Sequence, residues 1–534
     1  MPIFIVTSLG AKGATPFDSW CAIGAQPALD PSRIVPDLAG QMEAAYDAIS
    51  SSWWELARSL NAEPSAALAH APACAANVSD FGLMLAWDHL VRQWRGAPSR
   101  ILVVCDDPWL FRHLAPMAAV AGRPPPLVRR SLVLWGRGGL ARLLVAVRMA
   151  WSTLRLARDR RAYRPRSPAL LVYGHPVSRP DGTDGYFGRL MADAPALRRV
   201  LHVDCDAARA RALKGGAGQT VSLHAWGSLG QALGLPFARW RPRPDHLHGN
   251  FGWLVRRAAA LEGSTGQPAM VRWQQICQRA WLSQALPSHV AWPWENHAWE
   301  RDLVAQARQH GIRTIGYQHA TVGTREWNHS PRSSPVGEES LPDLILVSGS
   351  QWQKQLLAFG CPSARVQLAG AWRAPALDPL PHDPKGPVFV ALPADSAIAE
   401  EMVDAVRPLA EKGHRFEIKE HPMSPFPFAE GKGLSRASEP LARHSGVSAV
   451  LYAATTVGLE ALIGGLPTLR FQPRSRVPND IAAGFAVPVC NAETLDAALK
   501  TLRPSARVDA ESVFAVPRLD IWRAAFDQYA TQGV

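Results

Sequence analysis

Residues 388–419 read VFVALPADSAIAEEMVDAVRPLAEKGHRFEIK and decide the fold. The apolar run Val388–Leu392 predicts a buried strand. Ala397–Glu411 predicts a helix that ends before Gly413, because glycine readily adopts the left-handed conformation that closes a helix. Phe416–Lys419 predicts the next strand. A helix between two continuous apolar strands is typical of a parallel sheet with helices on both faces.

Short apolar runs alternate with helical stretches through most of the chain. At 534 residues the chain is too long for a single hydrophobic core. We therefore predict an α/β fold in which two Rossmann-like domains face each other across a cleft. The further predicted strands are Ile101–Cys105, Ala169–Tyr173, Val200–Val203, His289–Trp292, Arg313–Tyr317, Leu344–Val347, Ala449–Tyr452 and Thr468–Phe471.

The domain boundary is predicted in a polar, proline-rich stretch at residues 320–342. The first domain is expected to span residues 1–340 and the second residues 341–515. Residues 516–534 contain a predicted helix, Leu519–Tyr529, which we expect to pack back on the first domain.

The composition is that of a folded chain, with 47% hydrophobic and 19% charged residues. The seven cysteines are scattered without a CxxC spacing, which favours reduced thiols and argues against a zinc site. The N-terminal stretch MPIFIVTSLGAKG predicts a strand and a turn and lacks the features of a signal peptide. No apolar run is long enough to span a membrane. We therefore expect a cytoplasmic protein.

The net charge of +12 predicts an anionic partner. No nucleic-acid-binding motif is present, so we expect an anionic membrane surface or phosphorylated substrates and no nucleic acid; arginine-rich codon usage is the alternative. Residues 131–166, where only Asp159 opposes the positive charge, predict a helix on the inner face of the cytoplasmic membrane, or else a buried helix with a solvated arginine edge. The arginines of this segment are Arg137, Arg142, Arg148, Arg155, Arg158, Arg160, Arg161, Arg164 and Arg166.

Polar residues follow two predicted strands of the second domain, at the edge where open parallel sheets bind ligands. His421 and Pro422 follow one strand, and Thr455 and Thr456 follow another at the start of a helix. Two hydroxyls beside free backbone N–H groups can bind a phosphate, to which a histidine one strand away could also donate. Glu460, one turn later, could accept ribose hydroxyls. Alternatively, Thr456 is only a helix cap and His421 only a loop residue.

The first domain offers candidate catalytic carboxylates. Glu295 follows the predicted strand that ends at Trp292, and Asp184 lies in a glycine-rich loop after another strand. Transfer to a hydroxyl needs a carboxylate near the acceptor, so Glu295 and Asp184 are the predicted catalytic residues. Gln318 and His319 follow the next strand and are assigned to donor binding. Alternatively, Glu295 only supplies charge to the first turn of a helix.

Two further motifs carry less information. Asp204, Cys205 and Asp206 match a metal-binding DxD motif, but a two-domain layout disfavours it. Residues 136–141 match GxGxxA, but Asp159 lies among arginines and not at a strand end, so a dinucleotide role is disfavoured. We expect neither a metal nor an organic cofactor.

The sequences KEHP (419–422) and YAATTVGLEALIGGLPTL (452–469) resemble the donor domain of GT-B glycosyltransferases of bacterial surface polysaccharides, in particular those that use CMP-activated ulosonic acids. Residues 294–323 and DGTDGYFGRL (181–190) resemble surface-carbohydrate biosynthesis proteins. The resemblance implies a donor site formed by Lys419, His421 and Pro422 with Thr455 and Thr456, in which His421 contacts the CMP phosphate. The acidic motif of sialyltransferases is absent from the sequence, so the catalytic base stays open.

The resemblance implies a glycosyltransferase that moves a sugar, such as a CMP-linked ulosonic acid of the Kdo, sialic or pseudaminic type. The acceptor would be a surface polysaccharide, as in capsule or lipopolysaccharide, or a lipid-linked glycan. A UDP-sugar transferase or a CDP-polyol phosphotransferase on the same fold is an alternative. A non-catalytic glycan- or membrane-binding scaffold is another.

Overall fold

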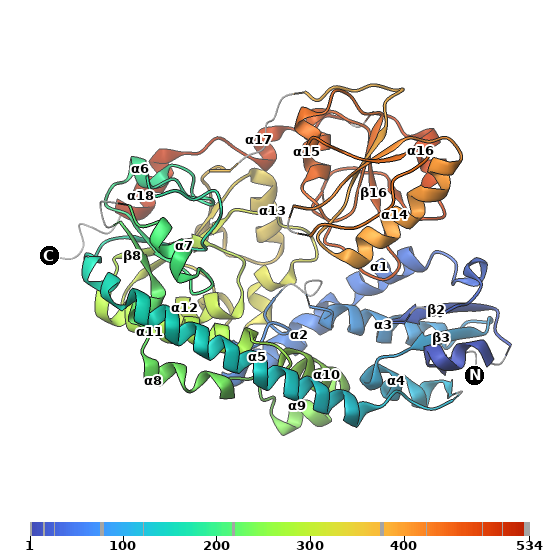
Figure 1. The fold of residues 1–534 in the computed structure, drawn as a ribbon, viewed down its shortest axis with the longest axis horizontal. Coiled ribbons are helices and arrows are strands. Elements are labelled where there is room, and N and C mark those ends of the chain that lie inside the picture. The colour runs from blue at the N-terminus through green and yellow to red at the C-terminus, as the bar shows by residue number, and fades with distance from the viewer. Residues whose placement is uncertain are drawn as a thin grey trace.

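The computed structural model describes residues 3–527 except 14–15, 26, 75–78, 121, 216–218, 374–378, 423, 483 and 505. These residues form three parallel sheets, each covered by helices (Figure 1). The α/β prediction is therefore confirmed, and the seven- and six-stranded sheets are the predicted pair of Rossmann-like domains. A smaller, four-stranded sheet precedes them in the chain.

The four-stranded sheet has the order β2-β3-β1-β4. Its strands are β1 (Ile3–Val6), β2 (Ser19–Ile23), β3 (Ile101–Cys105) and β4 (Ala119–Val120). Its helices are α1 (Leu38–Ala48), α2 (Ser50–Asn61), α3 (Phe81–Trp94) and α4 (Pro108–Leu114).

The seven-stranded sheet has the order β11-β10-β9-β8-β5-β6-β7. Its strands are β5 (Ala169–Val172), β6 (Arg198–Leu201), β7 (Thr220–Ser222), β8 (His289–Pro293), β9 (Arg313–Gln318), β10 (Leu344–Val347) and β11 (Val366–Leu368). Its helices are α5 (Leu127–Leu156), α6 (Leu190–Asp193), α7 (Ala207–Ala212), α8 (Leu229–Ala232), α9 (Pro244–His248), α10 (Gly252–Glu262), α11 (Gln267–Ala285), α12 (Ala298–Gln309) and α13 (Ser350–Ala358).

The six-stranded sheet has the order β14-β13-β12-β15-β16-β17. Its strands are β12 (Val388–Ala391), β13 (Phe416–Lys419), β14 (Leu434–Arg436), β15 (Ala449–Tyr452), β16 (Thr468–Phe471) and β17 (Val489–Cys490). The remaining helices are α14 (Ser396–Glu411), α15 (Val457–Gly464), α16 (Leu495–Thr501), α17 (Ala510–Val513) and α18 (Leu519–Asp527).

The predicted domain boundary at residue 340 is misplaced. Strand β10 pairs in parallel with β9, with Ile345 opposite Gly316, so the seven-stranded sheet continues to Leu368. The N-terminal residues 3–120 also form their own sheet and are not part of one first domain. An apolar run identifies a buried strand but does not identify the strand with which it pairs, so both errors have the same origin.

The last helix, α18, packs on the seven-stranded sheet, where the predicted terminal helix was expected. The Trp522 ring lies 5.1 Å from the ring of Tyr317 and 5.7 Å from that of Phe187. Its indole N–H donates to the carbonyl of Ala369 at 3.2 Å. Tyr529, the predicted end of this helix, lies outside the described residues.

The three sheets are joined at one buried carboxylate, Glu43 of α1. Arg470 of β16 donates to it at 2.7 Å, and Arg325, in the loop after β9, donates at 3.2 Å. Arg325 also binds Asp47 of α1 at 2.8 Å. Burial alone would raise the pKa of Glu43, but the hydrogen bond from Arg470 and the charge of Arg325 lower it to about 2. One ionised side chain therefore connects all three layers.

None of the helices in the described part of the chain is both long enough and apolar enough to cross a membrane.

Glu43→Ala is expected to lower the free energy of unfolding by about 3–5 kcal/mol, because two buried guanidinium groups lose the carboxylate that they share. Chemical denaturation followed by circular dichroism measures this loss. Glu55→Ala removes an exposed carboxylate from α2 and is the matched control, expected to change stability by less than about 0.5 kcal/mol. Equal small effects of both substitutions would contradict the role given to Glu43.

Candidate active site

Polar side chains follow four consecutive strands of the seven-stranded sheet at its carboxyl edge. In the spatial order β9-β8-β5-β6, these residues are His319 after β9, Glu295 after β8, His175 after β5 and Asp204 after β6. Since the carboxyl ends of parallel strands meet at one edge, these groups form one site. The structure therefore brings together Glu295 and His319, which the sequence predicts, with His175 and Asp204.

A buried carboxyl group positions Glu295. The Glu300 side chain of α12 accepts hydrogen bonds from the backbone N–H groups of Glu295 at 3.0 Å and Asn296 at 2.9 Å. Asn296 has a φ of 58°, a left-handed conformation that makes the turn between β8 and α12 tight. The Glu295 side chain is 44% exposed and lies 3.5 Å from the ring of His297. Its carboxylate is therefore accessible to a ligand.

His319 lies at the same edge of the sheet as Glu295, and its ring can form a hydrogen bond with a ligand. Its ring lies 5.0 Å from that of Tyr186, which in turn lies 5.3 Å from the ring of His175. Nδ1 of His319 is buried and has no hydrogen-bond partner among the described residues. Burial lowers the pKa of His319, although the Glu295 charge opposes this, so the ring is neutral at neutral pH. Arg373, in the segment after β11, interacts with Nε2 of His175 at 3.4 Å.

Asp184 does not belong to this group, which corrects its predicted catalytic role. Its carboxylate is fully buried, accepts from the backbone of Tyr186 at 2.9 Å and of Phe187 at 3.3 Å, and lies 3.7 Å from Arg199. The Ser178 hydroxyl donates to it at 3.3 Å. Asp184 therefore holds the loop that carries Tyr186 and leaves no oxygen for a substrate.

Two predicted donor-binding side chains are also engaged elsewhere. Lys419 donates to the carbonyls of Ala437 at 3.3 Å and Ser438 at 3.2 Å, which fixes the segment after β14. Gln318 is buried, and its side-chain oxygen accepts from the backbone of Ser348 at 3.0 Å. Gln318 thus joins the ends of β9 and β10 and does not reach a ligand.

His421 and Pro422 line a pocket at the carboxyl edge of the six-stranded sheet. Its volume is about 360 Å³, and Glu420 and Arg436, which form an ion pair, also line it. Burial lowers the pKa of His421, so its ring is neutral at neutral pH. A neutral imidazole still donates one N–H and can contact an anion.

The predicted threonine pair lies at the start of α15. The Thr455 hydroxyl accepts from the backbone N–H of Val457 at 3.4 Å, whereas Thr456 is exposed and makes no side-chain cap. Burial raises the pKa of Glu460, one turn further on. Strand β12 lies between β13 and β15, so His421 and Thr455 follow strands roughly 10 Å apart and not neighbouring strands as predicted. A ligand that touches both must therefore extend over two strand spacings.

Loops that follow strands of the two larger sheets touch each other. A Cβ on Gly323, in the loop after β9, would lie 1.9 Å from Oδ1 of Asn479, in the loop after β16. The loop that follows the strand of His319 therefore contacts the six-stranded domain, which carries His421 and Thr455.

The two aspartates of the DxD match, which the two-domain layout disfavours, contact neighbouring groups of the protein. The Asp206 carboxylate caps α7 by accepting from the N–H of Arg209 at 2.8 Å, and the Asp204 carboxylate lies 3.3 Å from His202. Within the described residues, no group of three or more His, Cys, Asp or Glu side chains could hold a metal ion.

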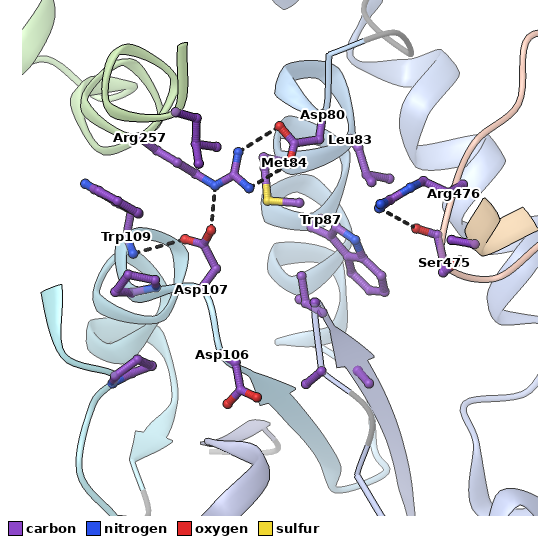
Figure 2. A pocket seen from close by; sticks show the side chains of 18 of the residues that line it. Asp80, Leu83, Met84, Trp87, Asp106, Asp107, Trp109, Arg257, Ser475 and Arg476 are labelled. Carbon is purple, nitrogen blue, oxygen red and sulfur yellow. Dashed lines mark hydrogen bonds and ion pairs between the residues drawn. The ribbon is translucent and has the colours of Figure 1, made fainter. Parts of the chain in front are cut away.

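A second candidate site is a cavity of about 990 Å³ between the four-stranded sheet and α14 (Figure 2). It lies at the carboxyl ends of β2 and β3, where Gly24 and Asp106 follow the strands. Leu83, Met84 and Trp87 of α3 supply its apolar lining. An apolar wall with a few convergent polar groups is the usual form of a small-molecule pocket.

Arg257 of α10 is the central charge of this cavity. Its guanidinium donates to Asp80 at 2.8 Å and to Asp107 at 2.6 Å, as Figure 2 shows. Burial opposes this charge, but the two carboxylates raise the pKa of Arg257 above its usual value. This cavity was not predicted from the sequence, although Asp106 and Asp107 follow the strand that ends at Cys105, where ligands of open parallel sheets bind.

No protein-family model matches this chain, and no curated protein matches it. Solved structures resemble it at low identity. The lipopolysaccharide outer core galactosyltransferase WaaB is 11% identical with a TM-score of 0.33, and the match covers 68% of this chain and 96% of that chain. The calicheamicin glycosyltransferase CalG4 is 13% identical with a TM-score of 0.39, covering 68% and 100%. The UDP-N-acetylglucosamine 2-epimerase of Neisseria meningitidis is 10% identical with a TM-score of 0.36, covering 68% and 100%.

Glu300→Gln is expected to change the pH dependence of stability. Burial and the neighbouring Glu295 charge raise the pKa of Glu300 from 4.5 to about 8. Between these values the unfolded chain releases a proton that the folded protein retains, so this group destabilises the wild type progressively as pH rises. The amide does not ionise, so the melting temperature of the variant should rise relative to wild type from about pH 5 to pH 8.

Glu339→Gln alters a carboxylate that is 74% exposed and serves as the control for this experiment. The control should follow the wild type at every pH. A constant difference in melting temperature between Glu300→Gln and the wild type from about pH 5 to pH 8 would show that Glu300 is ionised in the folded protein.

Proposed function

We propose that this protein is a glycosyltransferase that moves a sugar from a nucleotide donor to a glycan or lipid-linked glycan acceptor. The support is that an accessible carboxylate, Glu295, follows a strand of one Rossmann-like sheet, that His421 and the start of α15 follow strands of the other, and that loops of the two domains touch at Gly323. Donor and acceptor can meet between two such sheets while each is held by its own domain.

The chemistry follows from these groups. Glu295 accepts the proton of an acceptor hydroxyl as its oxygen attacks the anomeric carbon, and the bond from that carbon to the donor phosphate oxygen breaks. The nucleotide leaves with the bonding electrons as negative charge on its phosphate. Backbone N–H groups at the start of α15 and the N–H of His421 can stabilise this charge. His319, Tyr186 and Arg373 offer hydrogen bonds to sugar hydroxyls or a sugar carboxylate.

The donor is proposed to be a CMP-linked ulosonic acid. The support is the resemblance of the His-Pro pair at 421–422 and the threonine pair at 455–456 to transferases of this kind. The roughly 10 Å between β13 and β15 suits a nucleotide that extends from one motif to the other. A UDP-sugar donor is the second candidate, since the same edge could hold a diphosphate. We propose that the reaction takes place at the inner face of the cytoplasmic membrane.

His421→Ala is expected to lower the transfer rate by about 100- to 1,000-fold, because a donor that stabilises the leaving phosphate is lost. Thermal shift with CMP, UDP and CDP tests the donor: CMP should raise the wild-type melting temperature most, and less so in the variant. His310→Ala, at the exposed end of α12, is the matched control. Near-normal turnover of folded His421→Ala would refute the phosphate contact. Stabilisation by UDP alone would indicate a UDP-sugar donor instead of a CMP-linked one.

Glu295→Gln keeps the size of the side chain and removes its charge. The value of kcat should fall by about 100-fold or more, as for loss of a general base, while nucleotide affinity stays nearly unchanged. Nucleotide release and isothermal titration measure the two quantities. Glu338→Gln, an exposed carboxylate on the same domain, should behave like the wild type. Parallel loss of affinity and activity would place Glu295 on the donor side instead.

A further inference from the structure

Helix α5 exposes an apolar face that no other part of the described chain covers. Six side chains from Leu140 onward, spaced three, four, seven, eleven and fourteen residues from the first, occupy one side of the helix. Each is between 50% and 62% exposed. They are Leu140, Leu143, Leu144, Val147, Trp151 and Leu154. In Figure 1 this helix runs along the lower side of the molecule.

The neighbouring elements extend this face. Helix α8 and the short helix Leu235–Phe237 pack against α5. Leu233 is 78% exposed and Phe237 is 74% exposed. A groove of about 730 Å³ next to them is lined by Leu132 and Trp135 of α5 and by exposed arginines. We call the six side chains of α5 listed above, together with Leu233 and Phe237, the α5 face.

The opposite side of α5 is anchored in the protein, which separates the α5 face from the core. Leu134 and Met149 are buried there. The Arg142 side chain is also buried and donates to the carbonyl of Pro236 at 3.0 Å. This corrects the sequence interpretation for Arg142, which was expected among the surface-facing arginines. The structure thus shows one buried side of the helix, as the buried-helix alternative expects, and one exposed side.

Positive charge borders the α5 face. Arg137, Arg148 and Arg155 are separated by eleven and seven residues, so they share one flank of the helix. The Arg155 guanidinium lies over the ring of Trp151 at 4.6 Å. Helix α5 contains six arginines and no acidic residue over its thirty residues. Across the groove, Arg239 and Arg241 add two further exposed arginines.

We propose that the α5 face inserts into one leaflet of an anionic lipid bilayer, with α5 lying in the membrane plane. The apolar side chains enter the acyl region, and the bordering arginines bind lipid phosphates. The arginine border favours this occupant over a second copy of the chain, because pairing two such faces would bring like charges together. The inference concerns a surface distinct from the candidate active site and holds independently of the reaction.

The insertion would set the orientation of the large cavity described above. Pro126 and Arg130, at the start of α5, line the cavity of about 990 Å³. Leu127 and Val128, the neighbouring residues, line the groove of the α5 face. The cavity therefore adjoins the membrane surface in the proposed orientation.

Vesicle co-sedimentation tests the proposal with purified full-length protein and vesicles of phosphatidylcholine with or without phosphatidylglycerol. The wild type should bind the mixed vesicles and bind phosphatidylcholine alone more weakly. Leu144→Glu with Val147→Glu should lower binding at least tenfold, because charges in the acyl region are unfavourable. Val336→Glu with Val516→Glu changes two equally exposed apolar residues elsewhere and should leave binding unchanged. Arg137→Gln with Arg155→Gln should weaken binding to mixed vesicles about fivefold for each arginine.

Depth of insertion gives a second readout. Brominated acyl chains should quench tryptophan fluorescence of the wild type, and Trp151→Phe should remove most of this quenching. Failure of the folded wild type to bind mixed vesicles, or binding without quenching, would overturn insertion. A wild-type dimer in solution that Leu144→Glu with Val147→Glu dissociates would identify the α5 face as a contact between copies and would also overturn it.

Discussion

Glu43 is a single carboxylate on which all three layers of this protein depend. It is contributed by the four-stranded domain, and its two guanidinium partners come from the loop after β9 and from β16. A buried ion pair contributes little to stability over an apolar substitute, but breaking it leaves uncompensated charge. Such an interaction therefore favours one arrangement of the three sheets over arrangements in which the charges are unpaired. Because Arg325 lies close to Gly323 in the chain, the same ion pair anchors the loop that touches Asn479 of the six-stranded domain.

The candidate active site combines rigid placement with accessible chemistry. Glu300 is removed from solvent and binds the turn that carries Glu295, so a buried group orients the exposed carboxylate of the candidate site. His319 follows the neighbouring strand β9, and within the described part of the chain its Nδ1 has no hydrogen-bond partner. In the six-stranded domain, the start of α15 supplies backbone N–H groups whose direction is set by the helix. The groups that would bind charge are therefore positioned before any ligand arrives.

Much of this arrangement could be predicted from the sequence. Apolar runs indicate buried strands and glycines indicate helix ends, and both signals are local. The strands at 289–293 and 416–419 and the strand-end positions of Glu295 and His421 follow from such local patterns. The pairing of strands does not follow from local patterns. The predicted boundary at residue 340 therefore cut through a continuous sheet, in which β10 pairs with β9. The hydrogen-bond and ion-pair partners of a polar side chain also depend on residues far away in the sequence. Asp184 and Lys419 are polar residues near strand ends, and only the packed structure shows that Arg199 and the backbone of Ala437 and Ser438 already bind them.

Helix α5 is already folded and fixed before it meets any partner. Gly138 approaches Gly263 so closely that a Cβ would lie 1.8 Å from the carbonyl oxygen, and Arg142 binds that same carbonyl. An amphipathic peptide that is unstructured in water must lose conformational entropy when it folds on a surface, and this weakens its adsorption. A helix held by its own protein avoids that loss. Its adsorption would then be governed by contact area and charge alone, with rapid arrival and departure, so the protein could exchange between surface and solution without refolding.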